Sequence, residues 1–302
     1  MDDVTVVIPT LNEAEGIVRV IEEVRGVGVS KILVVDGGST DGTVELARGA
    51  GARVVFQEGR GKADAVRTAF RHVDTPYMVV MDGDFTYPAE YIKDIVDKLR
   101  EGFDEVIGAR RFPEPGAMPR LFAFGNRLLT WWFNLLFGTR LSDVLSGMYG
   151  LRRNAVADAL FATRGFSIEV EIAAHVASAG EVTEVPIRYR RRLGRKKLGV
   201  RHGFQIALDA LRLSWHYSPL FTLALAGALL FVPGVFIASW VAYRWIFLGV
   251  KHYVWGIIAV SLIAGGVASG AVAALALFLK RMERRFVRLL RRCGEKPSNP
   301  LF

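Results

Sequence analysis

Two long apolar stretches in the C-terminal third constrain this chain more than any other feature of its sequence. They cover residues 219–243 and 253–279, and neither contains a charged residue. Each is long enough to cross the roughly 30 Å hydrocarbon layer of a membrane as an α-helix. A short connection, residues 244–252, joins them. We therefore expect a helical hairpin that spans the membrane twice.

The formal net charge of +9 is concentrated in the same third of the chain. Residues 188–302 hold 19 Lys and Arg against 3 Asp and Glu, whereas residues 1–187 hold 20 against 27. Basic clusters beside apolar spans are typical of proteins that contact anionic membrane lipids, so nucleic acid is not expected as a partner. Positive charge at the outer ends of both spans predicts an integral membrane protein whose termini and N-terminal domain are cytoplasmic.

The N-terminal part alternates short apolar runs with segments of helical periodicity. Strands are expected at 4–9, 32–36, 53–56, 77–82 and 104–109, and helices at 14–25, 42–50, 62–72 and 88–101. This alternation predicts an α/β fold with a doubly wound, mainly parallel sheet. Ligands of such sheets bind beyond the carboxyl ends of the strands. Four acidic residues fall at these ends, namely Glu13, Asp36, Asp82 and Asp84.

Two segments are amphipathic, one within the α/β domain and one between that domain and the hairpin. In residues 118–137, aromatic and Leu side chains alternate with Arg and Asn, which fits a helix in the membrane interface and equally a buried domain helix. The expected organisation is an α/β domain over 1–200 that includes this segment, a second interface helix over 201–218, the hairpin, and a basic cytoplasmic tail over 280–302.

The sequence Asp82-Gly83-Asp84 follows a predicted buried strand. Two carboxylates one residue apart can both turn toward one hard cation, and Gly83 lets the chain bend between them. Mg²⁺ or Mn²⁺ held in this way usually takes its remaining ligands from water and phosphate oxygens, which points to a diphosphate substrate. An ordinary polar turn is the alternative for this motif alone.

The second predicted strand ends in Asp36, which is followed by a glycine-rich turn, Gly37-Gly38-Ser39. Asp36 can accept hydrogen bonds from a base or a ribose at the mouth of the sheet. The spacing of the glycines does not match the dinucleotide-binding fingerprint, and residues 56–63 do not match a P-loop. A nucleotide-binding dehydrogenase or triphosphatase is therefore disfavoured.

Six segments occur in an order and at a spacing that resemble the family 2 inverting glycosyltransferases of GT-A fold. They are VVIPTLNEAEGI, VVDGGSTDGT, GRGKADAVRTAF, MDGDFTYP, IGARR and SDVLSGMYGLRR. Within this family they look most like the dolichyl-phosphate mannose synthases of archaea and eukaryotes. The resemblance covers roughly residues 1–200, and the hairpin also resembles a reduced form of the membrane part of cellulose synthase.

The resemblance implies a donor site at the sheet's mouth. Pro9, Glu13 and Asp36 would line the nucleoside pocket, and Lys62 would lie near the diphosphate. Asp82 and Asp84 would hold the metal, Mg²⁺ or Mn²⁺. The synthases often have Gln where this chain has Thr86, so a third protein ligand is in doubt and water is the alternative.

The resemblance also implies an acceptor site. Arg110 and Arg120 match arginines that hold the acceptor's phosphate, a task that suits a planar guanidinium. For Arg120, contact with lipid headgroups is an equal alternative. Asp143 matches the family's acidic acceptor-side motif and is a candidate general base, with helix capping as the ordinary alternative.

The expected activity is transfer of a hexose to a lipid-carried acceptor. By resemblance the donor is GDP-mannose, with UDP-glucose or UDP-N-acetylhexosamine as alternatives. The acceptor is dolichyl or polyprenyl phosphate, or a lipid-linked oligosaccharide of N-glycan biosynthesis. A non-catalytic membrane scaffold with a degenerate nucleotide pocket is the alternative of another class. Lipid transport is disfavoured, because the spans carry no intramembrane charge.

Overall fold

A computed structural model describes residues 1–157, 168–193 and 219–294 of the chain. The side chains at 120–121, 219–222, 280–281 and 283–294 are not among the described parts. The chain divides into two compact units, Met1–Leu211 and Arg212–Phe302. The interface helix predicted over 201–218 lies outside the described residues.

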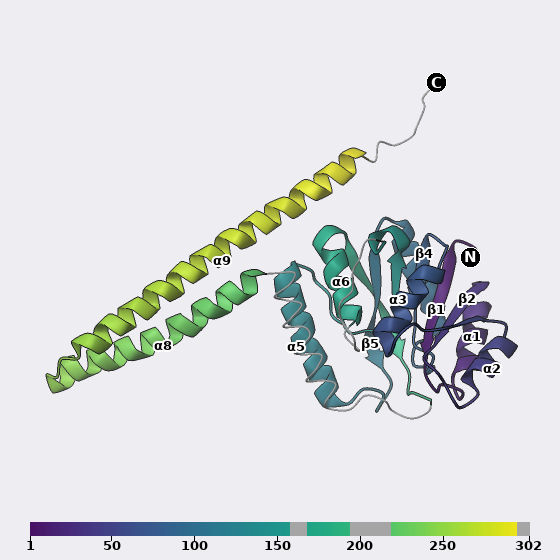
Figure 1. The fold of residues 1–302 in the computed structure, drawn as a ribbon, viewed down its shortest axis with the longest axis horizontal. Helices are drawn as coiled ribbons and strands as arrows, with labels where there is room; N and C mark the ends of the chain where they lie inside the picture. Colours follow the sequence, from purple (N-terminus) through teal and green to yellow (C-terminus); the bar gives the residue numbers. More distant parts are fainter. Residues whose placement is uncertain (158–167, 194–218, 295–302) are drawn as a thin grey trace, which may run out of the picture. The chain divides into compact units, whose positions relative to one another are not determined.

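A seven-stranded sheet forms the centre of the N-terminal unit (Figure 1). In spatial order its strands are β3 (Arg53–Phe56), β2 (Lys31–Asp36), β1 (Val4–Thr10), β4 (Tyr77–Val80), β6 (Tyr149–Arg152), β5 (Glu105–Pro113) and β7 (Val182–Tyr189). All neighbouring strands are parallel except β6, which is antiparallel to both β4 and β5. The predicted doubly wound, mainly parallel α/β fold is confirmed.

Helices cover both faces of this sheet. On one face α1 (Ile17–Gly26), α2 (Thr43–Gly49) and α4 (Ile92–Arg100) bury their apolar sides in a core with alternate residues of β1, such as Val4, Val6 and Ile8. On the other face lie α3 (Lys62–His72) and α6 (Ile168–Ala179). Two short 3₁₀ turns, η1 (Ala89–Tyr91) and η2 (Arg153–Ala155), complete the unit.

Helix α5 (Arg120–Phe137) presents apolar side chains on two sides. Thr130, Phe133 and Phe137 are buried in the N-terminal unit. Four other side chains at helical spacing are 54–66% exposed, namely Phe124, Leu128, Trp131 and Leu135. The helix thus both packs on its domain and leaves an apolar stripe exposed, which is the pattern expected of a helix that also contacts lipid.

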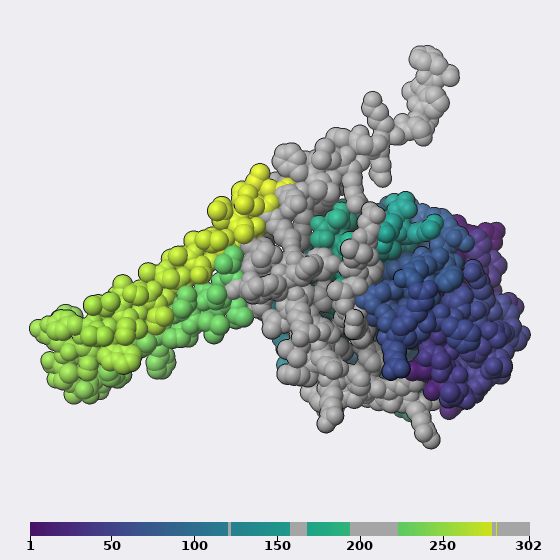
Figure 2. Space-filling view, in the orientation of Figure 1, coloured from purple at the N-terminus to yellow at the C-terminus, as the bar shows by residue number. Residues whose placement is uncertain are grey.

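The C-terminal unit is a hairpin of α8 (Pro219–Leu248) and α9 (Tyr253–Gly294), whose helices lie along one another (Figures 1 and 2). Leu223–Leu248 and Tyr253–Leu279 are long and apolar enough to cross a membrane, and only 11% of each apolar window is buried. A soluble core helix would be mostly buried, so these exposed surfaces support membrane association. The first span extends past its predicted end at residue 243 and includes Arg244.

Glycines let the two helices of the hairpin approach closely. A Cβ atom on Gly234 would lie 2.9 Å from the backbone nitrogen of Ile263, and one on Gly266 would lie 2.8 Å from that of Phe231. Gly227 faces the same interface, because a Cβ on it would lie 3.1 Å from the carbonyl oxygen of Gly266. Gly266 and Gly270 form a GxxxG pair, of which Gly266 contributes to packing within the hairpin.

Candidate active site

A cavity of about 510 Å³ lies at the carboxyl ends of the central strands in the N-terminal unit. Six of the nine predicted site residues line it, namely Pro9, Glu13, Lys62, Asp82, Asp84 and Arg110. Asp36 and Asp143 are buried behind its wall, and the side chain of Arg120 is outside the described part of the structure. The cavity therefore brings together acidic and basic groups from segments far apart in the sequence.

Asp82 and Asp84 follow β4 and enter the cavity at its floor. The Asp82 side chain is 30% exposed, whereas Asp84 is buried. Asp84 accepts hydrogen bonds from the backbone nitrogen of Thr86 at 3.1 Å and from its hydroxyl at 2.5 Å. Burial, together with the negative charge of Asp82, raises the pKa of Asp84. The site therefore concentrates negative charge that a bound cation would relieve.

Glycines make room for these two carboxylates. A Cβ on Gly147, in the loop before β6, would overlap Asp82 Oδ2. A Cβ on Gly83 would lie 3.0 Å from the Thr10 side chain of β1. Gly147 also donates its N–H to the Tyr87 hydroxyl at 2.7 Å. Gly147 thus belongs to the site because it gives space to Asp82, a role that the sequence motif alone did not indicate.

Lys62, the first residue of α3, bridges two carboxylates. Its Nζ lies 2.7 Å from Asp82 Oδ1 and 2.6 Å from Glu169 Oε1 on α6. Burial by itself would lower the pKa of Lys62, but the charges of Asp82 and Glu169 raise it well above its usual value. The side chain therefore stays an ammonium group and supplies a fixed positive charge beside Asp82.

The donor set fits a divalent cation that shares its ligands with a substrate. Among the described residues, no group of three or more His, Cys, Asp and Glu could hold a metal ion. Asp82 and Asp84 would therefore supply two carboxylates, and substrate oxygens or water the rest, as Mg²⁺ and Mn²⁺ commonly accept. Because the Thr86 hydroxyl is engaged by Asp84, the contacts favour water over Thr86 as a further ligand.

Arg192 links two acidic residues of the cavity, Glu13 and Asp84. Its guanidinium lies 2.5 Å from Glu13 Oε1 and 3.3 Å from Asp84 Oδ2. The backbone after β7 holds it there, since the N–H groups of residues 190 and 193 donate to the carbonyl oxygens of Thr86 and Asp84, at 2.9 and 3.1 Å. A second cation thus faces the carboxylate pair.

Asp36 is placed differently from the other acidic residues. It is fully buried at the end of β2 and accepts hydrogen bonds from the backbone nitrogens of Gly38 and Ser39, both at 2.8 Å. The Ser39 hydroxyl donates a third, at 2.5 Å. These bonds shape the turn that brings Gly37 to the cavity wall. Direct contact between Asp36 and a nucleoside stays a prediction.

Arg110, which lines the cavity, forms a buried ion pair with Asp143. Asp143 accepts hydrogen bonds from Arg110 Nε at 2.6 Å, from Arg110 Nη2 at 2.8 Å and from the Asn126 amide nitrogen at 2.8 Å. Burial by itself would raise the pKa of Asp143, but the Arg110 guanidinium holds it below the usual value. A carboxylate with a low pKa and both oxygens engaged is poorly suited to accept a proton. These contacts favour a role for Asp143 in positioning Arg110, and its role as general base stays a prediction.

A β-bulge sets the direction of Arg110. The pairing of β5 with β7 shifts register between Arg110 and Phe112, and a bulge of this kind re-aims nearby side chains. The Arg110 guanidinium lies 5.4 Å from the ring centroid of Tyr189 and donates to the Leu145 carbonyl at 3.0 Å. The Asp143 carboxylate, the Leu145 carbonyl and the Tyr189 ring together hold the guanidinium of this residue at the cavity surface.

Several lining residues were not predicted as members of the site. They are Arg192 in the basic run that follows β7, Glu169 on α6, and the two tyrosines Tyr87 and Tyr189. The start of α5 and the residues before it form an apolar wall, made by Ala117, Met118, Pro119 and Phe122. That wall continues the apolar character of residues 118–137, which is the signal that could have indicated it.

Comparisons with known proteins agree with this geometry. A family model described as "Glycosyl transferase family 2" matches residues 5–144. Glycosyltransferase AglJ of Haloferax volcanii is 38% identical over 294 residues, which cover 94% of this chain and 97% of AglJ. The dolichyl-phosphate hexose transferase of the same organism is 36% identical over 200 residues, which cover 65% of this chain and 87% of that protein.

A solved structure has a similar fold. It is glucosyl-3-phosphoglycerate synthase from Mycobacterium tuberculosis, in complex with Mn²⁺, UDP-glucose and phosphoglyceric acid. The TM-score is 0.59 at 24% identity, over 70% of this chain and 79% of that one. At this level of identity the likeness concerns the GT-A fold alone.

Proposed function

Because the chain belongs to glycosyltransferase family 2, we propose that it transfers a hexose from a nucleoside diphosphate sugar to a polyprenyl phosphate at a membrane surface. One observation carries the proposal. A single cavity is lined by a carboxylate pair with Lys62 and by the Arg110 guanidinium, which Asp143 holds in place. The first group suits a departing diphosphate, and the second suits an incoming phosphate.

The donor side neutralises the leaving group. A divalent cation, Mg²⁺ or Mn²⁺, would be held by Asp82 and Asp84 and would offset the charge of the nucleoside diphosphate as it departs. Lys62 adds a fixed positive charge next to Asp82. Pro9 and Glu13 line the same cavity and would contact the nucleoside. The similar solved structure contains Mn²⁺ and UDP-glucose, which supports a divalent ion and a nucleotide sugar without specifying this chain's metal or base.

The acceptor side favours a phosphate over a hydroxyl. A phosphate monoester is already anionic near neutral pH, so its oxygen can attack the anomeric carbon without losing a proton. The bond from the anomeric carbon to the donor's β-phosphate oxygen breaks, and that oxygen leaves with the electron pair. Arg110 would orient the phosphate, with Arg120 as a second candidate. A glycan hydroxyl would need a general base, and the engagement of Asp143 by Arg110 disfavours that alternative.

The lipid part of the acceptor has a matching surface. Met118, Pro119 and Phe122 give the cavity an apolar wall, and α5 carries an exposed apolar stripe. A relative is named a dolichyl-phosphate hexose transferase, which agrees with a polyprenyl phosphate acceptor. We propose GDP-mannose as the donor, with UDP-glucose and UDP-N-acetylhexosamine as alternatives. The proposed orientation has the α/β unit and both termini in the cytoplasm, as the flanking charges predict.

Incubation with labelled donors tests the proposal. The full chain in membranes, supplied with a polyprenyl phosphate, receives GDP-mannose, UDP-glucose or UDP-N-acetylglucosamine, and the lipid extract is analysed. We expect one donor to give a labelled lipid phosphate, and the product to disappear when EDTA removes divalent cations.

Asp84→Asn should lower product formation at least about 100-fold, because it removes a charged ligand of the cation. Asp94→Asn is the matched control, since Asp94 is exposed on α4 and does not line the cavity. Full activity of Asp84→Asn would refute the metal assignment. The absence of product and of metal-dependent donor turnover with every donor would favour the scaffold alternative.

A further inference from the structure

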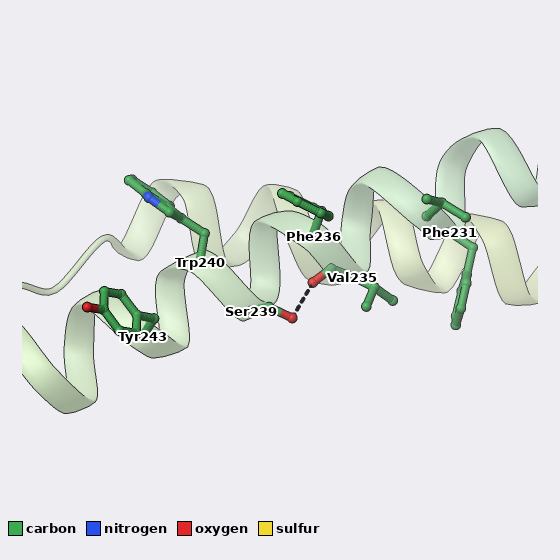
Figure 3. A pocket seen from close by; sticks show the side chains of 7 residues that line it. Phe231, Val235, Phe236, Ser239, Trp240 and Tyr243 are labelled. Carbon is green, nitrogen blue, oxygen red and sulfur yellow. Dashed lines mark hydrogen bonds between the residues drawn. The ribbon is translucent and has the colours of Figure 1, made fainter.

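We propose that the hairpin carries a binding site for one anionic glycerophospholipid, built from a groove on α8 and the cations at the hairpin turn. The groove has a volume of about 530 Å³ and is lined by Phe231, Val232, Val235, Phe236, Ser239, Trp240 and Tyr243 (Figure 3). This site is separate from the transfer reaction and lies wholly within the C-terminal unit.

The groove is chemically suited to an acyl chain. Its only aliphatic hydroxyl, that of Ser239, donates to the carbonyl oxygen of Val235 at 2.8 Å, so the donor is satisfied within the helix (Figure 3). The remaining lining is aromatic and aliphatic apart from the Tyr243 hydroxyl. Phe236 is 79% exposed along this surface, and apolar area of this kind is stabilised by contact with a hydrocarbon chain.

A cationic cluster adjoins one end of the groove. The His252 ring stacks on Trp240, with centroids 4.8 Å apart, and the Arg244 guanidinium lies 5.9 Å from the same indole centroid. Trp255 packs edge-on against Trp240 at 6.4 Å. Contacts from α8, the turn and α9 thus hold two basic side chains beside Trp240, which lines the groove.

These basic groups lack an acidic partner within the described hairpin. Residues 219–282 contain no Asp or Glu that could offset Arg244 or Lys251. Arg244 Nε and His252 Nε2 are buried atoms without a hydrogen-bond partner among the described residues. Buried polar atoms are rarely left unpaired, and a charge beside hydrocarbon needs a counter-ion. A lipid phosphate beside Arg244 and Lys251 would supply that counter-ion.

The turn between the helices holds the cluster in a fixed geometry. Gly249 has a positive φ of 67° and donates its N–H to the carbonyl oxygen of Trp245 at 3.2 Å, which is the left-handed cap that commonly ends a helix. Val250 donates its N–H to the carbonyl oxygen of Arg244 at 3.1 Å. These bonds tie the basic residues of the turn to the end of α8. The cations are therefore pre-organised, which favours one headgroup over diffuse attraction to a charged surface.

Charge also favours a phospholipid over a second copy of the chain as the occupant of the groove. A second copy of the chain could cover the apolar groove, but it would bring its own Arg244 and Lys251 toward the first set in a symmetric contact, and like charges repel. An anionic phospholipid offers a complementary phosphate together with a chain for the groove. The bilayer supplies it to a spanning hairpin, so no further protein is required.

Native mass spectrometry of the full chain tests the site. The protein is incubated in detergent with phosphatidylglycerol or phosphatidylcholine, and the lipid retained per chain is measured after collisional activation. We expect one retained phosphatidylglycerol and little phosphatidylcholine. Arg244→Gln should weaken phosphatidylglycerol retention by about fivefold, since a basic residue near a membrane surface contributes roughly that factor.

Two further variants separate this site from general charge attraction. Ser239→Trp fills the groove while keeping every cation, and it should also lower retention. Lys93→Gln removes one exposed charge on α4 and should leave retention unchanged. Equal retention of the two phospholipids, unchanged retention in Arg244→Gln, or stronger retention of a polyprenyl phosphate would overturn the proposal. Because no donor sugar is present, the result is independent of the proposed transfer activity.

Discussion

Asp84 and Asp143 carry the same carboxylate group but have different surroundings, and these surroundings decide their roles. Asp84 is buried beside another negative charge, which raises its pKa. Asp143 is buried beside Arg110, which lowers its pKa. The first arrangement favours binding of a cation, and the second favours a permanent ion pair. Both residues were predicted as members of the site, but their neighbours come from distant segments that the sequence does not order in space.

A double-mutant cycle distinguishes positioning from proton transfer at Asp143. Asp143→Asn should lower kcat/KM for a polyprenyl phosphate on the order of 10²-fold, because the Arg110 guanidinium loses its fixed position. Arg110→Gln should cause a similar loss, and the double variant should be no worse than Arg110→Gln alone. Additive losses in the double variant would instead mean that Asp143 acts independently of Arg110, as a general base would.

The pH dependence provides a second readout of the same pair. Because the folded-state pKa of Asp143 is depressed, its stabilising contribution is present above the pKa of the unfolded chain and is lost as pH falls through the folded value. Removing one partner of a buried pair costs about 3–5 kcal/mol, so a folding control by thermal unfolding accompanies the kinetics. An acidic limb of kcat that persists in Arg110→Gln and disappears in Asp143→Asn would contradict the positioning role, because a limb that reports loss of the ion pair requires Arg110.

Secondary structure was predicted best where long periodic patterns specify it. The first five strands and four helices lie close to their predicted ranges, because alternating apolar runs determine which faces are buried. The antiparallel β6 was not predicted as such. It has four residues and contains Gly150, at which an added Cβ would overlap the Ile95 side chain of α4. Its position therefore depends on tertiary packing rather than on a local pattern.

Site residues also differ in whether a local sequence pattern or tertiary packing determines their positions. The acidic groups at strand ends could be predicted, since parallel strands carry their carboxyl ends to one edge of the sheet. Arg192 could not, because its position depends on backbone bonds to Asp84 and Thr86. Phe85, between those residues, has a φ of 67°, a conformation that a sequence of this kind does not indicate. Local strain of this kind is typical of functional turns.

The glycine interface of the hairpin makes a prediction at the level of elements. Gly234→Leu should separate α8 from α9, because its Cβ would meet the backbone nitrogen of Ile263 at 2.9 Å. Overpacking of this kind costs about 1–3 kcal/mol. In a Cys293→Ser background, a short bifunctional thiol reagent should cross-link Leu230→Cys to Gly265→Cys, since a Cβ on Gly265 lies 3.5 Å from Leu230 Cδ1 and the two positions face each other.

That cross-link should be lost or slowed in Gly234→Leu. Gly256→Leu is the matched control, because a Cβ on Gly256 has no neighbour within 4 Å, and it should leave the cross-link intact. Equal cross-linking in both variants would mean that the glycines do not set the helix spacing.

Two physical environments are combined in the whole chain. One unit holds a cavity with charged and apolar walls at the carboxyl ends of a mainly parallel sheet, and the other exposes apolar helices that are suited to lipid. In the proposed reaction, the cavity binds the water-soluble nucleotide sugar, and the exposed apolar side chains suit the lipid that carries the phosphate. The proposed transfer reaction requires above all that a divalent cation held by Asp82 and Asp84 binds the diphosphate of the donor.

Isothermal titration of the full chain in detergent with GDP and with UDP is the sharpest test of this requirement. We expect one nucleotide to bind in the presence of Mn²⁺, and its affinity to fall about 10–100-fold or more with EDTA or in Asp84→Asn, because a bridging ligand is lost. Asp94→Asn should bind as the wild type does. Affinity that is the same with and without Mn²⁺, and unchanged in Asp84→Asn, would show that no cation on these carboxylates holds the donor.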